Sequence, residues 1–77
     1  MDQIKILLNK KMYHKPAVIE SIDSFSGICT SELEEDNTSF HITLIPTEQV
    51  SEKEIFEIRY EFCNHCLANS KQKFSML

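Results

Sequence analysis

Glycine and proline are scarce in this 77-residue chain, and their positions divide it into segments. Gly27 is the only glycine, and the two prolines are Pro16 and Pro46. These residues interrupt or begin regular structure, so the apolar periodicity of each stretch between them indicates its secondary structure. A chain of this length has room for one small core, so we expect residues 1–77 to form a single domain.

The first stretch, residues 2–8, predicts a β-strand. Ile4, Ile6 and Leu8 alternate along it and share one face, which is the pattern of a strand with one buried side. Leu7 points to the opposite face and suggests that this face is also partly covered.

Residues 28–35 and 40–44 predict a β-hairpin. The first of these strands is rich in glutamate, which is typical of a sheet edge that must not pair with other chains. The second alternates strictly and ends at Pro46, and the polar run 36–39 between the strands consists of turn formers. His41 lies on the polar face of the second strand, where we expect it to contact solvent.

The remaining two segments predict helices. Pro16 suits the first turn of a helix over residues 15–26, and Gly27 is expected to end it in a left-handed conformation. Ser51 and Glu54 form a capping box, so a long helix is expected over residues 52–70, with residues 71–77 as a frayed tail.

The element order is therefore β-α-β-β-α, and the predicted fold class is α+β. We expect a small three-stranded sheet covered on one face by two helices, the C-terminal one being long. The first strand and the hairpin cannot all be sequential neighbours, so a right-handed β-α-β link is expected between them.

The closing helix carries more apolar width than one packing face needs. At about 100° per residue, Ile55, Ile58, Phe62 and Cys66 form a first stripe, and a second stripe is centred roughly 110° away. The second stripe consists of Phe56, Tyr60, Cys63 and Leu67. The first stripe can cover the sheet, so we expect the second to be at least partly exposed as a binding surface. The alternative is complete cover by the short helix and by the tail residues Phe74, Met76 and Leu77.

Arg59 projects between the two stripes, and two interpretations fit its position. Its aliphatic stem can pack on apolar neighbours while the guanidinium reaches water. It can also pair with a carboxylate, either on a partner or on Glu32 or Glu34, because a guanidinium recognises carboxylates in a bidentate manner.

Cys63 and Cys66 form a C-x-x-C pair on the same helix. Two thiolates at this spacing can share a metal ion, with further ligands from Cys29, His41 or His14. Against this, both cysteines lie on apolar stripes, and a redox C-x-x-C normally begins at a helix N-terminus. We therefore expect no metal and no cofactor. A metal-binding or thiol-redox protein using Cys63 and Cys66 is the second hypothesis, and a small homodimeric structural domain is the third.

Composition narrows the possible functions. Eight basic residues against twelve acidic ones give a net charge of −4, which argues against nucleic acid as the main partner. No stretch approaches the roughly 18 apolar residues of a membrane span. The odd number of cysteines and the absence of a leader-like segment predict a cytoplasmic protein with free thiols. Phosphate-binding glycine loops and known catalytic motifs are also absent, so we expect no enzymatic activity.

Four short segments carry a resemblance to a known family. They are Met12-Tyr13, Pro16-Ala17-Val18-Ile19, Leu44-Ile45-Pro46, and Glu61-Phe62-Cys63-Asn64 with Leu67. With the order of elements, they resemble the small D component of the His-Xaa-Ser peptide-modification systems (HxsD-like proteins). Asn64 and Leu67 match the pattern of that family's closing helix, whereas His65, Cys66 and Lys71 stand where acidic, apolar and arginine residues are usual. The resemblance implies a non-catalytic accessory protein that acts beside a radical-SAM maturase.

The leading hypothesis is thus a cytoplasmic, non-catalytic accessory or adaptor protein. It would present its long helix, and an open sheet edge, to a radical-SAM maturase or to the substrate peptide of that enzyme. The residues expected to bind the partner are Phe56, Arg59, Tyr60, Cys63, Asn64 and Leu67.

Overall fold

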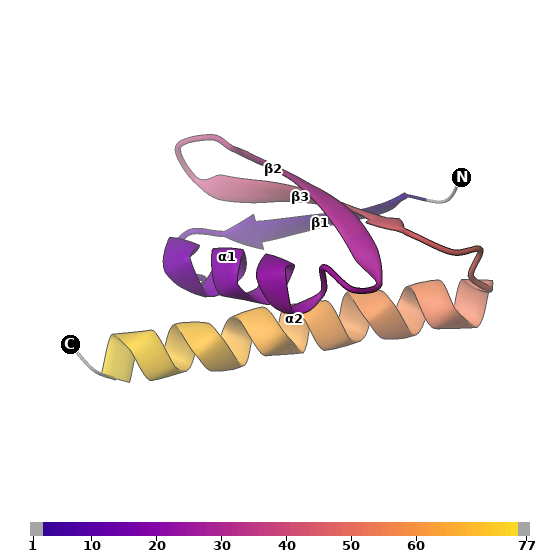
Figure 1. The fold of residues 1–77 in the computed structure, drawn as a ribbon. Helices are drawn as coiled ribbons and strands as arrows, with labels where there is room; N and C mark the ends of the chain where they lie inside the picture. The colour runs from indigo at the N-terminus through magenta and orange to yellow at the C-terminus, as the bar shows by residue number, and fades with distance from the viewer. Residues whose placement is uncertain (1–2, 76–77) are drawn as a thin grey trace.

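The computed structural model describes residues 3–75 of the chain and the side chains of residues 3–71. Its elements follow in the order β1 (Ile4–Asn9), α1 (Lys15–Ser24), β2 (Cys29–Glu35), β3 (Ser39–Pro46) and α2 (Glu52–Ser75). Figure 1 shows both helices on the same side of the sheet, with α2 running along the length of the molecule. The expected α+β fold and its β-α-β-β-α order are confirmed.

β3 is the central strand of the sheet. The spatial order is β1-β3-β2, and both neighbours pair with β3 in antiparallel orientation. Ile42 of β3 lies opposite Ile6 on one side and Leu33 on the other. Because β1 and β2 are both antiparallel to β3, they are parallel to each other, and α1 provides the expected β-α-β connection between them.

The core lies between the sheet and the two helices. Alternate residues of β1 and β3 point into it, as the periodicity predicted. Its buried apolar side chains are Ile4, Ile6, Leu8, Val18, Cys29, Phe40, Ile42, Leu44, Phe62 and Cys66. The opposite face of the sheet has no layer over it among the described residues, and 66% of the Leu7 surface is exposed there. The expected partial cover over Leu7 is therefore wrong, because both helices occupy the other face.

The helix ends follow the predicted signals in part. The capping box of α2 is confirmed: the Ser51 amide donates to Glu54 Oε1 and the Glu54 amide donates to Ser51 Oγ, both at 3.2 Å. The expectation for Gly27 is wrong, because this glycine has no positive φ. Instead, α1 ends in a turn in which the Phe25 amide donates to the Ser21 carbonyl and the Cys29 amide donates to the Phe25 carbonyl.

α2 is longer than expected. It continues to Ser75 instead of ending near Ser70, and residues 76–77 of the expected tail lie outside the described part of the chain. Its C-terminal half packs beside α1, and near the start of α1 the His14 amide donates to Ser70 Oγ at 2.9 Å.

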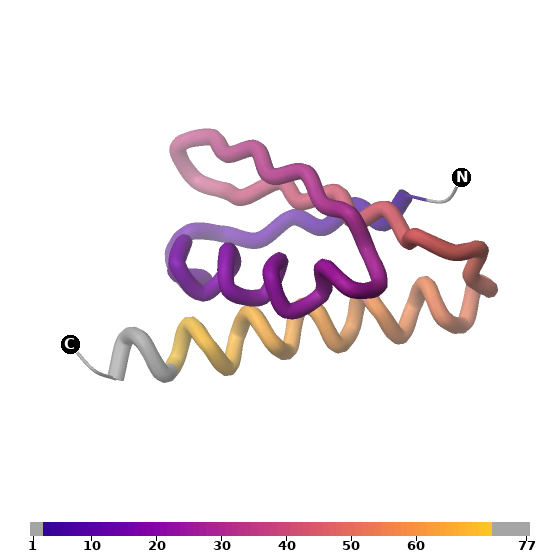
Figure 2. The backbone as a smooth tube through the Cα atoms, viewed as in Figure 1, coloured from indigo at the N-terminus to yellow at the C-terminus, as the bar shows by residue number. Residues whose placement is uncertain are grey.

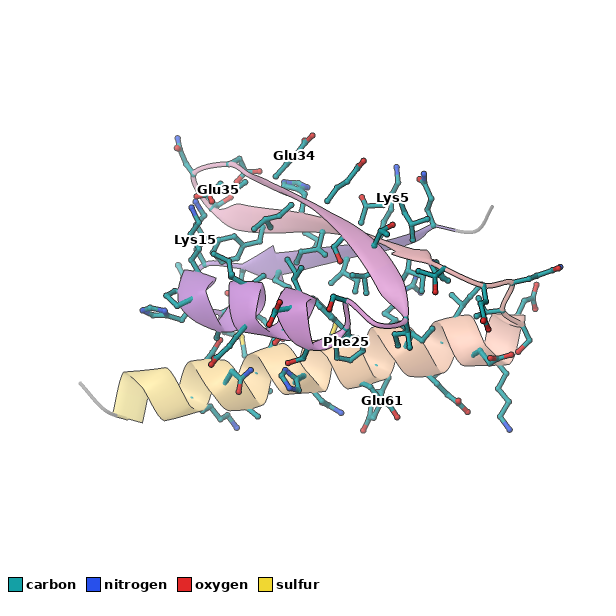
Figure 3. All side chains as sticks on the ribbon, viewed as in Figure 1. Lys5, Lys15, Phe25, Glu34, Glu35 and Glu61 are labelled. Atoms are coloured by element: carbon teal, nitrogen blue, oxygen red, sulfur yellow. The ribbon has the colours of Figure 1, made fainter. Side chains whose placement is uncertain are left out.

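One end of the sheet is tied to α1 by Glu35. Lys15 Nζ lies 2.7 Å from Glu35 Oε2, and Lys10 Nζ lies 3.0 Å from Glu35 Oε1. Figure 3 shows Lys15 and Glu35 side by side at this end of the molecule. Hydrogen bonds from Lys15 and then Lys10 lower the pKa of the Glu35 carboxyl. Such exposed ion pairs fix geometry more than they add stability.

Candidate functional site

The first stripe of α2 faces the core, as expected. Phe62 and Cys66 are fully buried, and Ile55 and Ile58 are half-buried. The Phe62 ring meets the Phe25 ring edge to face, with their centroids 5.2 Å apart. α2 packs against β1 and α1 through this side, so the first stripe holds the helix in place.

The N-terminal part of the second stripe of α2 is exposed, whereas Cys63 packs against the core. Phe56 and Tyr60, one turn apart, expose 69% and 64% of their surface. Cys63 and Leu67, in the next two turns, are half-buried. Exposed aromatic side chains in adjacent turns are typical of binding surfaces, because Tyr and Phe contribute large contact areas.

The other two residues predicted to bind a partner, Arg59 and Asn64, are also exposed. Pairing of Arg59 with Glu32 or Glu34 is not observed: the ion pairs between described residues do not include Arg59. Figure 3 shows the reason for Glu34, which points away from the helices on the outer face of the sheet. The Arg59 guanidinium is thus available to a carboxylate of another molecule.

α1 does not cover the exposed part of the second stripe. The α2 residues that meet α1 include His65 and Asn69, whose side chains approach Ser21. At about 100° per residue, these two positions lie roughly 170° from the centre of the second stripe. The alternative cover by Phe74, Met76 and Leu77 concerns side chains outside the described part of the chain.

The three cysteines are free thiols in protein surroundings that keep them protonated. Cys29 and Cys66 are buried, and Cys63 is half-buried. Burial raises the pKa of all three thiols, that of Cys66 to about 11; at Cys63 the nearby Arg59 charge acts in the opposite direction. Because the thiolate is the nucleophile and the metal ligand, these surroundings oppose both roles.

The suggested additional ligands do not converge on Cys63 and Cys66. His41 lies on β3, where its Nε2 is 2.8 Å from Asp36 Oδ2. This contact is on the exposed side of the sheet, away from the helices. Among residues 3–71, no three His, Cys, Asp or Glu side chains are arranged to hold a metal ion.

A polar cluster between the two helices was missed by the sequence analysis. Ser21 Oγ lies 2.8 Å from His65 Nδ1, and Asn69 Nδ2 lies 3.1 Å from the same nitrogen. The Ser21 hydroxyl also donates to the Ala17 carbonyl at 2.9 Å, and Ser21 is fully buried. A buried hydroxyl that is bonded to its own helix is a poor nucleophile, so the cluster positions α1 on α2. The i, i+4 spacing of His65 and Asn69 indicates a shared face, whereas no sequence signal marks Ser21.

The uncovered face of the sheet carries a shallow depression of about 630 Å³. Two cross-strand rows line it, Lys5–Thr43–Glu32 and Leu7–His41–Glu34. The depression is acidic overall, because its lining carries one lysine, Lys5, against the carboxylates of Glu32, Glu34, Glu35 and Asp36. Charged side chains are typical of the solvated face of an antiparallel sheet.

Comparisons with known proteins give no relative: no protein-family model, curated protein or solved structure matches the chain. Within residues 3–75, neither helix combines the length and apolarity that crossing a membrane requires.

Proposed function

We propose that this protein is a non-catalytic accessory protein that binds a protein or peptide partner through the second stripe of α2. The observation that carries the proposal is the exposure of Phe56 and Tyr60 in adjacent turns of α2. The partner implied by the resemblance is a radical-SAM maturase or its substrate peptide. Arg59, beside the stripe, supplies a charge that would pair with a carboxylate of that partner.

The physical support is the difference between the two stripes of one helix. The first stripe already supplies the contacts that hold α2 against the sheet, so the fold does not need Phe56 or Tyr60 for its core. Exposed aromatic side chains do not stabilise the monomer, whereas their burial against a partner would remove apolar surface from water. β1, against which α2 packs, is also an edge strand, and an extended peptide could add to it through main-chain hydrogen bonds.

The test is a binding measurement with the maturase and precursor peptide encoded by neighbouring genes. Each is titrated against the wild-type protein and against Tyr60→Ala. We expect Tyr60→Ala to weaken binding about tenfold or more, because buried interface tyrosines are often hot spots. Ile19→Ala is the matched control, since Ile19 is an exposed apolar residue of α1.

The circular dichroism spectrum of each variant shows whether the fold is preserved. Wild-type affinity in a folded Tyr60→Ala variant would exclude the second stripe as the binding surface. Unfolding of this variant would mean that Tyr60 belongs to the core in solution. If no radical-SAM gene lies beside the gene for this protein, a radical-SAM maturase is excluded as the proposed partner.

A further inference from the structure

The N-terminal half of α2 has a free side next to the end of α1. α1 ends at Ser24, while α2 extends well beyond it (Figure 2). In the space that α1 leaves, a groove of about 370 Å³ lies between α2, the turn after α1 and the loop after β3. A helix face with no neighbouring helix is a place where another helix can pack.

The groove has an apolar part. Ile28, from the turn after α1, exposes 50% of its surface, and Ile58 of α2 is half-buried beside it. Val50, from the loop before α2, is also half-buried. An occupant that brings one or two aliphatic side chains would remove this surface from water.

The groove is also strongly acidic. Of the described residues that line it, four are glutamates and none is basic. Glu48, Glu57 and Glu61 are exposed, and none of them forms an ion pair with another described residue. Glu54 differs, because its carboxylate accepts the Ser51 amide in the capping box. The negative charge of the groove therefore favours a cationic ligand.

We propose that this groove binds a basic amphipathic helix of a protein partner. Aliphatic side chains of that helix would pack on Ile28 and Ile58, and its lysines or arginines would lie beside Glu48, Glu57 and Glu61. The site is separate from the second stripe, which lies on the opposite flank of α2. The inference therefore does not depend on the proposed function.

The probe is a fluorescent synthetic peptide that forms a helix with leucines at i, i+3, i+4 and i+7 and lysines elsewhere. Binding to the full chain is followed by fluorescence anisotropy at low salt. The charge variant is Glu57→Gln with Glu61→Gln, and its matched control is Glu32→Gln with Glu34→Gln on β2. Both double variants remove the same charge, and only the first changes the groove.

The apolar contribution is tested by a second matched pair. Ile28→Ala alters the groove, whereas Ile19→Ala removes an isoleucine of nearly equal exposure, 49%, from α1. Glu54 is left unchanged, because its replacement would also remove a helix cap.

We expect the wild-type protein to bind the peptide, and the Glu57/Glu61 variant to bind it about tenfold more weakly. The Glu32/Glu34 control should change the affinity by less than about twofold. Ile28→Ala should weaken binding by about threefold or more, and Ile19→Ala should leave it unchanged. Tyr60→Ala should also leave it unchanged, which separates this site from the second stripe.

Four results would overturn the inference. Equal weakening by the two charge variants would show only general attraction to an acidic protein. Equal effects of Ile28→Ala and Ile19→Ala on the affinity would mean that the apolar contact at Ile28 does not contribute to binding. Failure of the wild-type protein to bind the lysine peptide, or equal binding of a peptide with glutamates in place of the lysines, would exclude a cationic occupant.

Discussion

Cys66 is the residue whose chemistry depends most clearly on its burial. Its side chain is fully buried in the core beside Phe62, and burial raises the pKa of its thiol from an ordinary value of 9.0 to about 11. A hydrogen bond with Ser21 acts in the opposite direction and is the smaller effect. The thiol is therefore neutral at physiological pH.

This shift predicts how stability depends on pH in the alkaline range. In the unfolded chain the thiol ionises near pH 9.0, whereas in the folded protein it does so near 11. The stabilisation is thus complete below pH 9.0 and is lost as the pH rises towards 11, because the unfolded state then binds fewer protons. We expect Cys66 to contribute a loss of about 2 to 3 kcal/mol over this range.

Urea denaturation at several pH values measures this loss. Cys66→Ala should be less stable than the wild-type protein at neutral pH and should have a visibly shallower decline above pH 9. An equally steep decline in the variant would mean that other groups cause the alkaline loss and that the Cys66 thiol does not.

At the scale of the element, Phe56 and Phe62 of α2 are in opposite environments. Phe62 is fully buried, and Phe56 is 69% exposed. Phe62→Ala should reduce the free energy of unfolding by about 3 to 5 kcal/mol, because it leaves a cavity in a small core. Phe56→Ala should change it by less than about 0.5 kcal/mol. Urea denaturation of both variants checks the contrast, and a large loss in Phe56→Ala would place Phe56 in a buried environment in solution.

The elements themselves were predictable because their signals are local. The alternation of Ile4, Ile6 and Leu8, the position of Pro16 and the capping box of Ser51 and Glu54 each act within a few residues. The conformation of Gly27 was not predictable in this way. Its turn is closed by the main-chain bonds of Phe25, so no left-handed residue is needed there.

The surface of α2 was predictable only in part. The width of its apolar arc indicated that one stripe would be exposed, and Phe56 and Tyr60 are exposed. The side on which α1 packs depends on long-range contacts such as that between Ser21 and His65. The groove beside Ile28 depends on how α2, the turn after α1 and the loop after β3 lie relative to one another, so neither feature has a signature in the local sequence.

At the scale of the whole molecule, α2 separates charge between its two flanks. Glu57 and Glu61 lie towards the groove, while Arg59 and Lys53 lie beside the second stripe. A twofold dimer through the second stripe would place this face of the two copies against each other. The accessory proposal keeps this face for a different protein, so the mass of the protein in solution tests the homodimer hypothesis.

We expect the purified protein to sediment as a monomer. Analytical ultracentrifugation at two well separated concentrations should give the same sedimentation coefficient in low and in moderate salt. A rise towards the mass of a dimer, reversed by Tyr60→Ala, would instead show that a second copy occupies the second stripe. That outcome would replace the accessory proposal with a homodimeric one.

The central position of β3 has a consequence for how this chain is made. During synthesis β1 and β2 leave the ribosome before β3, and neither finds a partner in the sheet until residues 39–46 have emerged. Until then the nascent chain exposes the apolar row Ile4, Ile6 and Leu8 and two orphan strand edges, which are open to pairing with other chains. A truncated product that stops before Ser39 would therefore be prone to aggregate instead of forming a smaller version of the fold.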